Sequence, residues 1–185
     1  MLETADVGDT MTATADRARD GFDGATACGT ILVECFGPDG KLKWRSEQDN
    51  LITAVGDTLY ASRGAGLTTV PTPTGMKLGS GTTAVAKTGA GAALVTYIAG
   101  SNKAFDATFP SQAAGVVTYK RTYAAGEATS AAAITEVVIV NDTIATDATS
   151  AAAATISRGL LANPAAKAAG DSLTVTWTHT ILGQP

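Results

Sequence analysis

Residues 31–63, ILVECFGPDGKLKWRSEQDNLITAVGDTLYASR, decide the fold. From 31 to 36 the side chains fall into two alternating sets, as on the two faces of a β-strand. A Pro-Asp-Gly turn follows at 38–40, with glycine where a positive φ is needed. The return strand places Leu42 and Trp44 on one face and basic side chains on the other. These residues predict a hairpin with one buried face and one wet, basic face.

The period changes after this hairpin. Leu51, Val55 and Leu59 recur at the spacing of a helix face, Asn50 is a suitable N-cap, and Gly64 can end the helix. An interior glycine weakens the helix by about 1 kcal/mol relative to alanine. We therefore expect one short helix that begins at Asn50 and covers an edge or an end of a sheet, with Trp44 as a core anchor.

The rest of the chain reads as a series of strands separated by turn-rich segments. A period of two or a β-branched run marks six of them, at residues 75–81, 92–99, 115–123, 134–141, 153–161 and 172–182. With seven to nine strands and one helix, the fold class is mainly β. We expect an antiparallel β-sandwich, of jelly-roll or immunoglobulin-like order, with an extended N-terminal arm.

Composition bounds the organisation of the chain. Its 185 residues suit one domain that buries roughly 70% of its unfolded surface. Aromatic residues make up only 5% of the chain and glycine contributes 20 residues, so small and β-branched side chains must form the core. We expect an acidic arm over residues 1–29 and a single sandwich domain over 30–185.

The negative charge is concentrated in the first 24 residues, which hold six acids and two bases, while the remainder is neutral. This segment is polar and has no sustained amphipathic period, so by itself it should be extended. It is either a floppy tail or an arm that orders against a neighbouring subunit. The interface residues expected in the second case are Asp6, Asp9, Asp16, Arg17, Arg19, Asp20, Phe22 and Asp23.

The same charge balance argues against some partners. Nucleic-acid binding rests on clustered lysine and arginine, which this acidic chain lacks. The N-terminus has neither the basic start nor the apolar run of a secretory signal, and no stretch reaches the ~20 apolar residues that cross a bilayer. We expect a chain that is soluble when made, with no nucleic-acid or membrane partner.

Candidate chemistry is sparse. His179 is the single histidine, and its strand position favours a satisfied or rim histidine over a catalytic base. Cys28 and Cys35 lack metal-site spacing, and buried or partly buried free thiols are favoured over a disulfide. Three glutamates are candidates for a carboxylate pair, but they stand in different elements, and Glu34 is expected to be solvated or paired with Lys43. The sequence predicts no catalytic residues, no metal site, no cofactor and no enzyme. The three glutamates are Glu34, Glu127 and Glu136.

Four segments together resemble a family of small tailed-bacteriophage virion proteins. The first is VECFGPDGKLKWRSEQDNLITAVGDTLYASR at 33–63, with its DG turn, K-W strand and N-L-[IV]-T-x-x-G helix start. The others are GMKLGSGTTAVA at 75–86, the I-x-E-[VG] pattern at 134–137, and GDSLTVTW at 170–177. The similarity covers roughly residues 30–182. The chain departs from the family pattern at 138–140, where Val-Ile-Val replaces a G-[LF]-F ending.

The resemblance implies a non-enzymatic β-sandwich on a phage particle. It implies a capsid cement or decoration protein that binds the major capsid protein on the outer shell, often as a trimer. Such a protein would be made soluble in the bacterial cytoplasm and then reside on the virion. Two alternatives remain: a tail, baseplate or fibre-connecting virion protein, and a carbohydrate-binding adhesin module. The family implies no catalytic residues.

Overall fold

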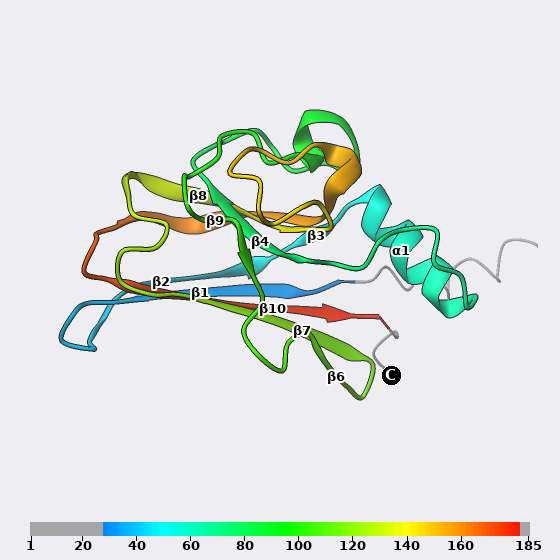
Figure 1. The fold of residues 1–185 in the computed structure, drawn as a ribbon, viewed down its shortest axis with the longest axis horizontal. Coiled ribbons are helices and arrows are strands. Elements are labelled where there is room, and N and C mark those ends of the chain that lie inside the picture. Colours follow the sequence, from blue (N-terminus) through cyan, green and yellow to red (C-terminus); the bar gives the residue numbers. More distant parts are fainter. Residues whose placement is uncertain (1–27, 182–185) are drawn as a thin grey trace, which may run out of the picture.

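The computed structural model describes residues 28–181, which form two antiparallel five-stranded sheets packed face to face (Figure 1). Sheet A has the order β2-β1-β10-β7-β6 and sheet B the order β3-β9-β8-β4-β5. The expected antiparallel sandwich with one α-helix is therefore confirmed. The strands of sheet A are β1 (Thr30–Phe36), β2 (Leu42–Asp49), β6 (Ser111–Ala113), β7 (Val116–Tyr123) and β10 (Ser172–Thr180). Those of sheet B are β3 (Leu51–Ile52), β4 (Gly75–Gly79), β5 (Lys103–Ala104), β8 (Ser130–Val140) and β9 (Thr155–Lys167).

The expected hairpin is formed by β1 and β2. Its turn closes through a hydrogen bond from Gly40 N to Gly37 O, and Gly40 has a φ of 75°. Trp44 is partly buried against the core, and its Nε1 donates to Ala166 O at 3.1 Å. Leu42 is 51% exposed, which corrects the expected buried face. The strand register shifts beside Phe36, so the end of β2 near the turn does not continue the buried row.

The helix begins later than expected. Leu51 pairs with β9 in the short strand β3, and α1 runs over Ala54–Gly64 with Thr53 as its N-cap. Asn50 is therefore not the cap. It stands between β2 and β3, where its N–H donates to Gly29 O and its Nδ2 donates to Ser157 Oγ at 2.7 Å. The chain thus crosses from sheet A to sheet B at Asn50, and α1 closes one end of the sandwich (Figure 1).

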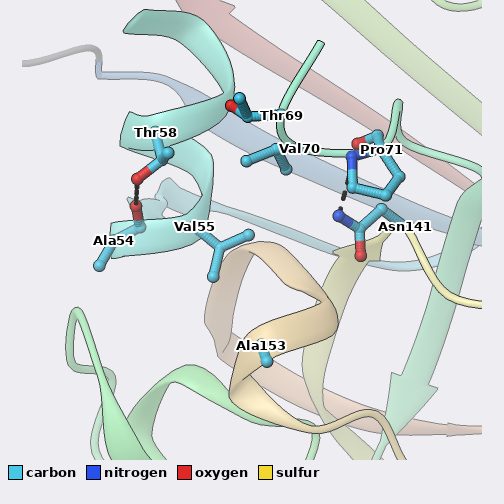
Figure 2. A pocket seen from close by; sticks show the side chains of 8 residues that line it. All are labelled: Ala54, Val55, Thr58, Thr69, Val70, Pro71, Asn141 and Ala153. Carbon is cyan, nitrogen blue, oxygen red and sulfur yellow. Dashed lines mark hydrogen bonds between the residues drawn. The ribbon is translucent and has the colours of Figure 1, made fainter. Parts of the chain in front are cut away.

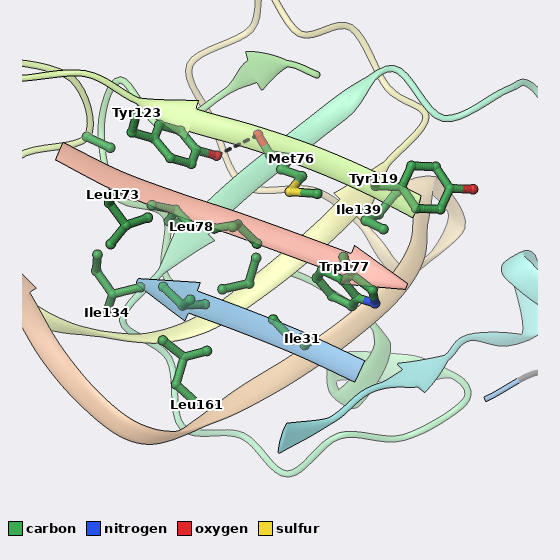
Figure 3. Close-up of a cluster of buried hydrophobic side chains, with 14 of the residues drawn as sticks. Ile31, Met76, Leu78, Tyr119, Tyr123, Ile134, Ile139, Leu161, Leu173 and Trp177 are labelled. Atoms are coloured by element: carbon green, nitrogen blue, oxygen red, sulfur yellow. Dashed lines mark hydrogen bonds between the residues drawn. The ribbon is translucent and has the colours of Figure 1, made fainter. Parts of the chain in front are cut away.

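The core lies between the sheets and combines aliphatic side chains with a few aromatic ones (Figure 3). Tyr119, Tyr123 and Trp177 are buried on neighbouring strands of sheet A. The Tyr123 hydroxyl donates to Met76 O and Ser101 O of the opposite layer. Tyr119 and Tyr123 therefore both contribute to the core.

Both faces of sheet B are buried where β4 pairs with β8 and β8 with the first half of β9, whereas the outer face of sheet A is not covered by any described element (Figure 1). Residues 92–99 do not form the expected strand. They follow a short 3-10 helix and pack Leu94 against Val138 and Val140 on the outer side of sheet B. Their apolar composition reflects this covering role, since a covering loop must bury side chains just as a strand does.

The sheet edges are short or blocked. The second half of β9, where the sequence predicts turns from residue 163, runs beside β2, and its backbone N–H groups donate to β2 side chains instead of forming a backbone ladder. Gln48 Oε1 accepts from Ala162 N and Ser46 Oγ accepts from Asn163 N, both at 3.0 Å. The remaining edges are the two-residue strands β3 and β5 and the three-residue strand β6. This arrangement limits edge-to-edge pairing with other chains.

Candidate functional site

An apolar cleft of about 360 Å³ opens beside α1 (Figure 2). It lies between the first turns of α1, the segment 69–71 and the loops after β8 and before β9. Val55 and Val70 face into it from two sides, and both also pack against the core. The lining residues are Ala54, Val55, Thr58, Thr69, Val70, Pro71, Asn141 and Ala153.

Two residues of α1 explain why the helix stands at this position. Thr53 Oγ1 accepts from Gly56 N at 3.2 Å and donates to Thr155 O, so the N-cap is tied to β9. A Cβ on Gly56 would lie 2.2 Å from Ile156 O. This interior glycine lowers helix propensity, but it is required for the close approach of α1 to β9.

Two polar side chains of the cleft, those of Thr58 and Asn141, are hydrogen-bonded to the protein itself. The Thr58 hydroxyl donates to Ala54 O at 2.8 Å, and Asn141 Nδ2 lies 3.4 Å from Pro71 O (Figure 2). Arg63 bridges the adjoining loop by donating to Leu67 O and to Val70 O. Because Val55, Val70, Pro71 and two alanines form most of its walls, the cleft suits an aliphatic or aromatic side chain better than a polar ligand.

A fully buried ion pair lies on the outer side of sheet B. Arg158 Nη2 and Nε donate to Glu136 Oε2 at 2.6 and 3.0 Å. Glu136 also accepts from three backbone N–H groups of the covering loop, those of Gly81, Val95 and Thr96. With this many donors around it, Glu136 serves to hold the loop on the sheet, and it is not available as an acid or nucleophile.

A second charged group joins β2 to the turn before β10. Lys43 Nζ donates to Asp171 Oδ2 at 2.7 Å, and this hydrogen bond raises the pKa of Lys43 and lowers that of Asp171. Glu34 lies opposite Arg45 in the strand register, is partly exposed and has no ion-pair partner among residues 28–181, so of its two expected environments it has the solvated one, and Lys43 binds Asp171 instead. Cys35 is buried beside Asp171, and burial raises the pKa of its thiol. A thiol held in its neutral form is a poor nucleophile.

His179 is fully buried between sheet A and α1. Its Nδ1 lies 2.5 Å from the Tyr60 hydroxyl, which in turn lies 3.0 Å from that of Tyr119. Burial lowers the pKa of His179 to about 3. Its Nε2 has no partner among the described residues, so the expectation of a satisfied ring holds for one nitrogen only. A general base that acts on an external substrate must be accessible from outside the protein. The fully buried ring of His179 is not.

The other candidates from the sequence lie apart. Glu127 binds Lys103 and Arg121 near the β5 edge and is separate from the Glu136 pair. Both cysteines are free; Cys28 is exposed, which corrects the expectation that it is buried or partly buried. Within residues 28–181, no group of three or more His, Cys, Asp or Glu side chains is arranged to hold a metal ion.

The eight arm residues predicted at an interface, from Asp6 to Asp23, lie outside the described residues. Sequence reasoning missed the cleft beside α1, because its walls come from four segments that lie far apart in the sequence. It also missed Arg158 and Asp171 as partners of Glu136 and Lys43. A charged residue inside an apolar strand, as at 156–161, is the signal that could have identified Arg158.

No helix in the described part of the chain has the length and apolarity needed to cross a membrane. Comparisons with family models, with curated proteins and with solved structures gave no match.

Proposed function

We propose that this chain is a non-enzymatic structural protein of a tailed-bacteriophage virion, a capsid cement protein that binds the outer shell. Its partner would be the major capsid protein, its contacts would stabilise neighbouring capsid subunits, and the chain would act as a homo-oligomer, with a trimer favoured. The observation that carries the proposal is that the four segments bearing the family resemblance contact one another in the fold.

Two of these contacts are ionic or charge-assisted. Lys43, from the K-W strand, binds Asp171, from the GD segment before the last strand, at 2.7 Å. Glu136, from the I-x-E pattern, accepts the N–H of Gly81 from the glycine-rich turn. A Cβ on Gly79 or on Gly81 would come within 2.5 Å of a Glu136 side-chain oxygen. With Glu136 in this position, a residue larger than glycine at 79 or 81 would collide with its carboxylate.

The N-L-I-T-x-x-G pattern of the helix start is used in the same way. Asn50 links the two sheets, Leu51 and Ile52 pair with β9, Thr53 caps α1, and Gly56 lets α1 approach β9. Each member of the pattern has a structural task at the crossing from sheet A to sheet B. A pattern that encodes a specific architecture is better support for common descent than matching composition would be.

The short or blocked sheet edges limit the ways in which such a protein could bind a capsid shell. Apart from β2, which lies beside β9, the edge strands among residues 28–181 have only two or three residues, so strand addition has little edge to use and shell contact would rest on the arm and on broad faces. The uncovered face of sheet A carries polar side chains that include those of Thr174, Thr176 and Lys120. Many weak contacts of this kind add up when a symmetric lattice presents the same site repeatedly.

Deletion of residues 2–24 tests the proposal. The truncated chain should unfold at the same urea concentration as the full chain but should no longer bind shells in a sedimentation assay. A control variant keeps the whole arm but changes its five aspartates to asparagine, so it distinguishes an effect of arm length on binding from an effect of arm charge. The five are Asp6, Asp9, Asp16, Asp20 and Asp23. Equal saturation of shells by the truncated and full chains would refute the role of the arm.

A further inference from the structure

We propose that the cleft beside α1 holds the side chain of Phe22 from the same chain, so that the base of the N-terminal arm is anchored on the sandwich. Phe22 is the single aromatic residue in the first 27 residues. The cleft offers apolar walls from Val55, Val70 and Pro71, and burial of an aromatic ring there removes apolar area from water. This inference does not depend on the virion role.

The chain geometry places the arm within reach. Gly29 O accepts from Asn50 N at 3.1 Å, and Asn50 is four residues from Ala54, a lining residue of the cleft. Four residues span at most about 14 Å, whereas the seven residues from Phe22 to Gly29 can span about 24 Å. The start of β1 and α1 also lie at the same end of the sandwich (Figure 1). Phe22 can therefore reach the cleft with slack in the chain.

Charge favours the same occupant. Arg63 adjoins the cleft through its hydrogen bond to Val70 O at 3.0 Å, and it has no carboxylate partner among residues 28–181. Asp20 and Asp23 flank Phe22 in the sequence. An aromatic ring between two carboxylates matches an apolar cleft with a guanidinium beside it.

Tethering selects the chain's own arm over that of a second copy. A short flexible linker gives an effective concentration in the millimolar range, which exceeds the concentration of other copies in dilute solution. Anchoring at Phe22 would leave residues 1–19 free to extend from a fixed point near α1. It would also reduce the conformational entropy that the arm loses when it binds a neighbour.

Disulfide trapping tests this arrangement in the full chain. Cys28→Ser removes the exposed native thiol, and Gly24→Cys is paired with Thr69→Cys at the rim of the cleft. The matched control pairs Gly24→Cys with Ala132→Cys on β8, nine residues or about 30 Å along the strand from Asn141 at the cleft. Crosslinked monomer, measured by intact mass and non-reducing gel, should form at least about tenfold faster in the cleft pair.

Adding Phe22→Ala to the cleft pair should abolish that advantage, and Val7→Ala should not. Crosslinking rates that do not change on dilution show that the arm in the cleft belongs to the same chain. Crosslinked dimers in place of monomers would overturn the proposal in favour of a second copy. Equal rates in the cleft and control pairs, or no effect of Phe22→Ala, would overturn it altogether. In a second measurement, Phe22→Ala should shift the methyl NMR signals of Val55 and Val70, and unchanged signals would also contradict the proposal.

Discussion

Replacement of Glu136 by glutamine should destabilise the protein strongly and release the loop that covers sheet B. The variant removes the negative charge but keeps nearly the same shape. It leaves the guanidinium of Arg158 without a counter-ion at a fully buried position. It also replaces one of the two carboxylate oxygens, which together accept from three loop amides and from Arg158, by an amide donor.

The expected loss follows from this environment. Removal of one partner of a buried pair costs about 3–5 kcal/mol, because a buried charge is left uncompensated. The exposed pair of Arg45 and Glu47 supplies a matched control, since its N–O distance is also 2.6 Å but both side chains are about half exposed. Glu47→Gln should therefore cost less than about 1 kcal/mol.

Urea unfolding followed by tryptophan fluorescence measures both free energies, with linear extrapolation to water. Hydrogen exchange adds a local reading, because the amides of Gly81, Val95 and Thr96 should lose protection in Glu136→Gln and keep it in Glu47→Gln. A loss below about 1 kcal/mol in Glu136→Gln, with these amides still protected, would refute the view that this carboxylate holds the loop.

Three further variants or conditions give separate tests. Gly56→Ala should lower the free energy of unfolding by about 2 kcal/mol, because the clash of the new methyl group with β9 outweighs the gain of ~1 kcal/mol in helix propensity. The control Gly64→Ala places its methyl group in open space and should not destabilise the protein. Burial lowers the pKa of His179 to about 3, so below pH 6.5 the unfolded chain takes up a proton that the folded protein does not. The free energy of unfolding should therefore fall by about 1.6 kcal/mol from pH 6.5 to 5. Urea titrations should show that His179→Gln abolishes this pH dependence. A thiol reagent should label Cys28 in the native protein and Cys35 only after unfolding; rapid labelling of Cys35 in the native protein would contradict its burial.

The parts of the fold that could be predicted are those in which one face is buried and the other is wet. The alternation in β10 and the Pro-Asp-Gly turn after β1 gave the correct hairpin and final strand. The helix start was placed too early, because Leu51 fits both a helix face and a two-residue strand. Only the pairing of Leu51 with Arg158 on β9 decides between them, and that contact is remote in sequence.

Segments on sheet B misled the prediction because that sheet is covered on both sides. Residues 92–99 are apolar as a covering loop, and periodicity does not separate such a loop from a buried strand. The turn-like composition at 163–167 hid the end of β9, where side chains of β2 satisfy the backbone and Pro164 is tolerated. The cleft beside α1 was not predictable for a related reason, since it exists only after four segments assemble.

Imaging of shells with and without this chain tests the central proposal most directly. Purified protein would be added to shells of the proposed partner, the major capsid protein, and the particles examined by electron cryo-microscopy. The account predicts added density of sandwich size at symmetry-related positions on the outer surface, reduced when residues 2–24 are deleted. Shells that remain bare at saturating concentrations of the full chain would contradict a role as a capsid cement protein.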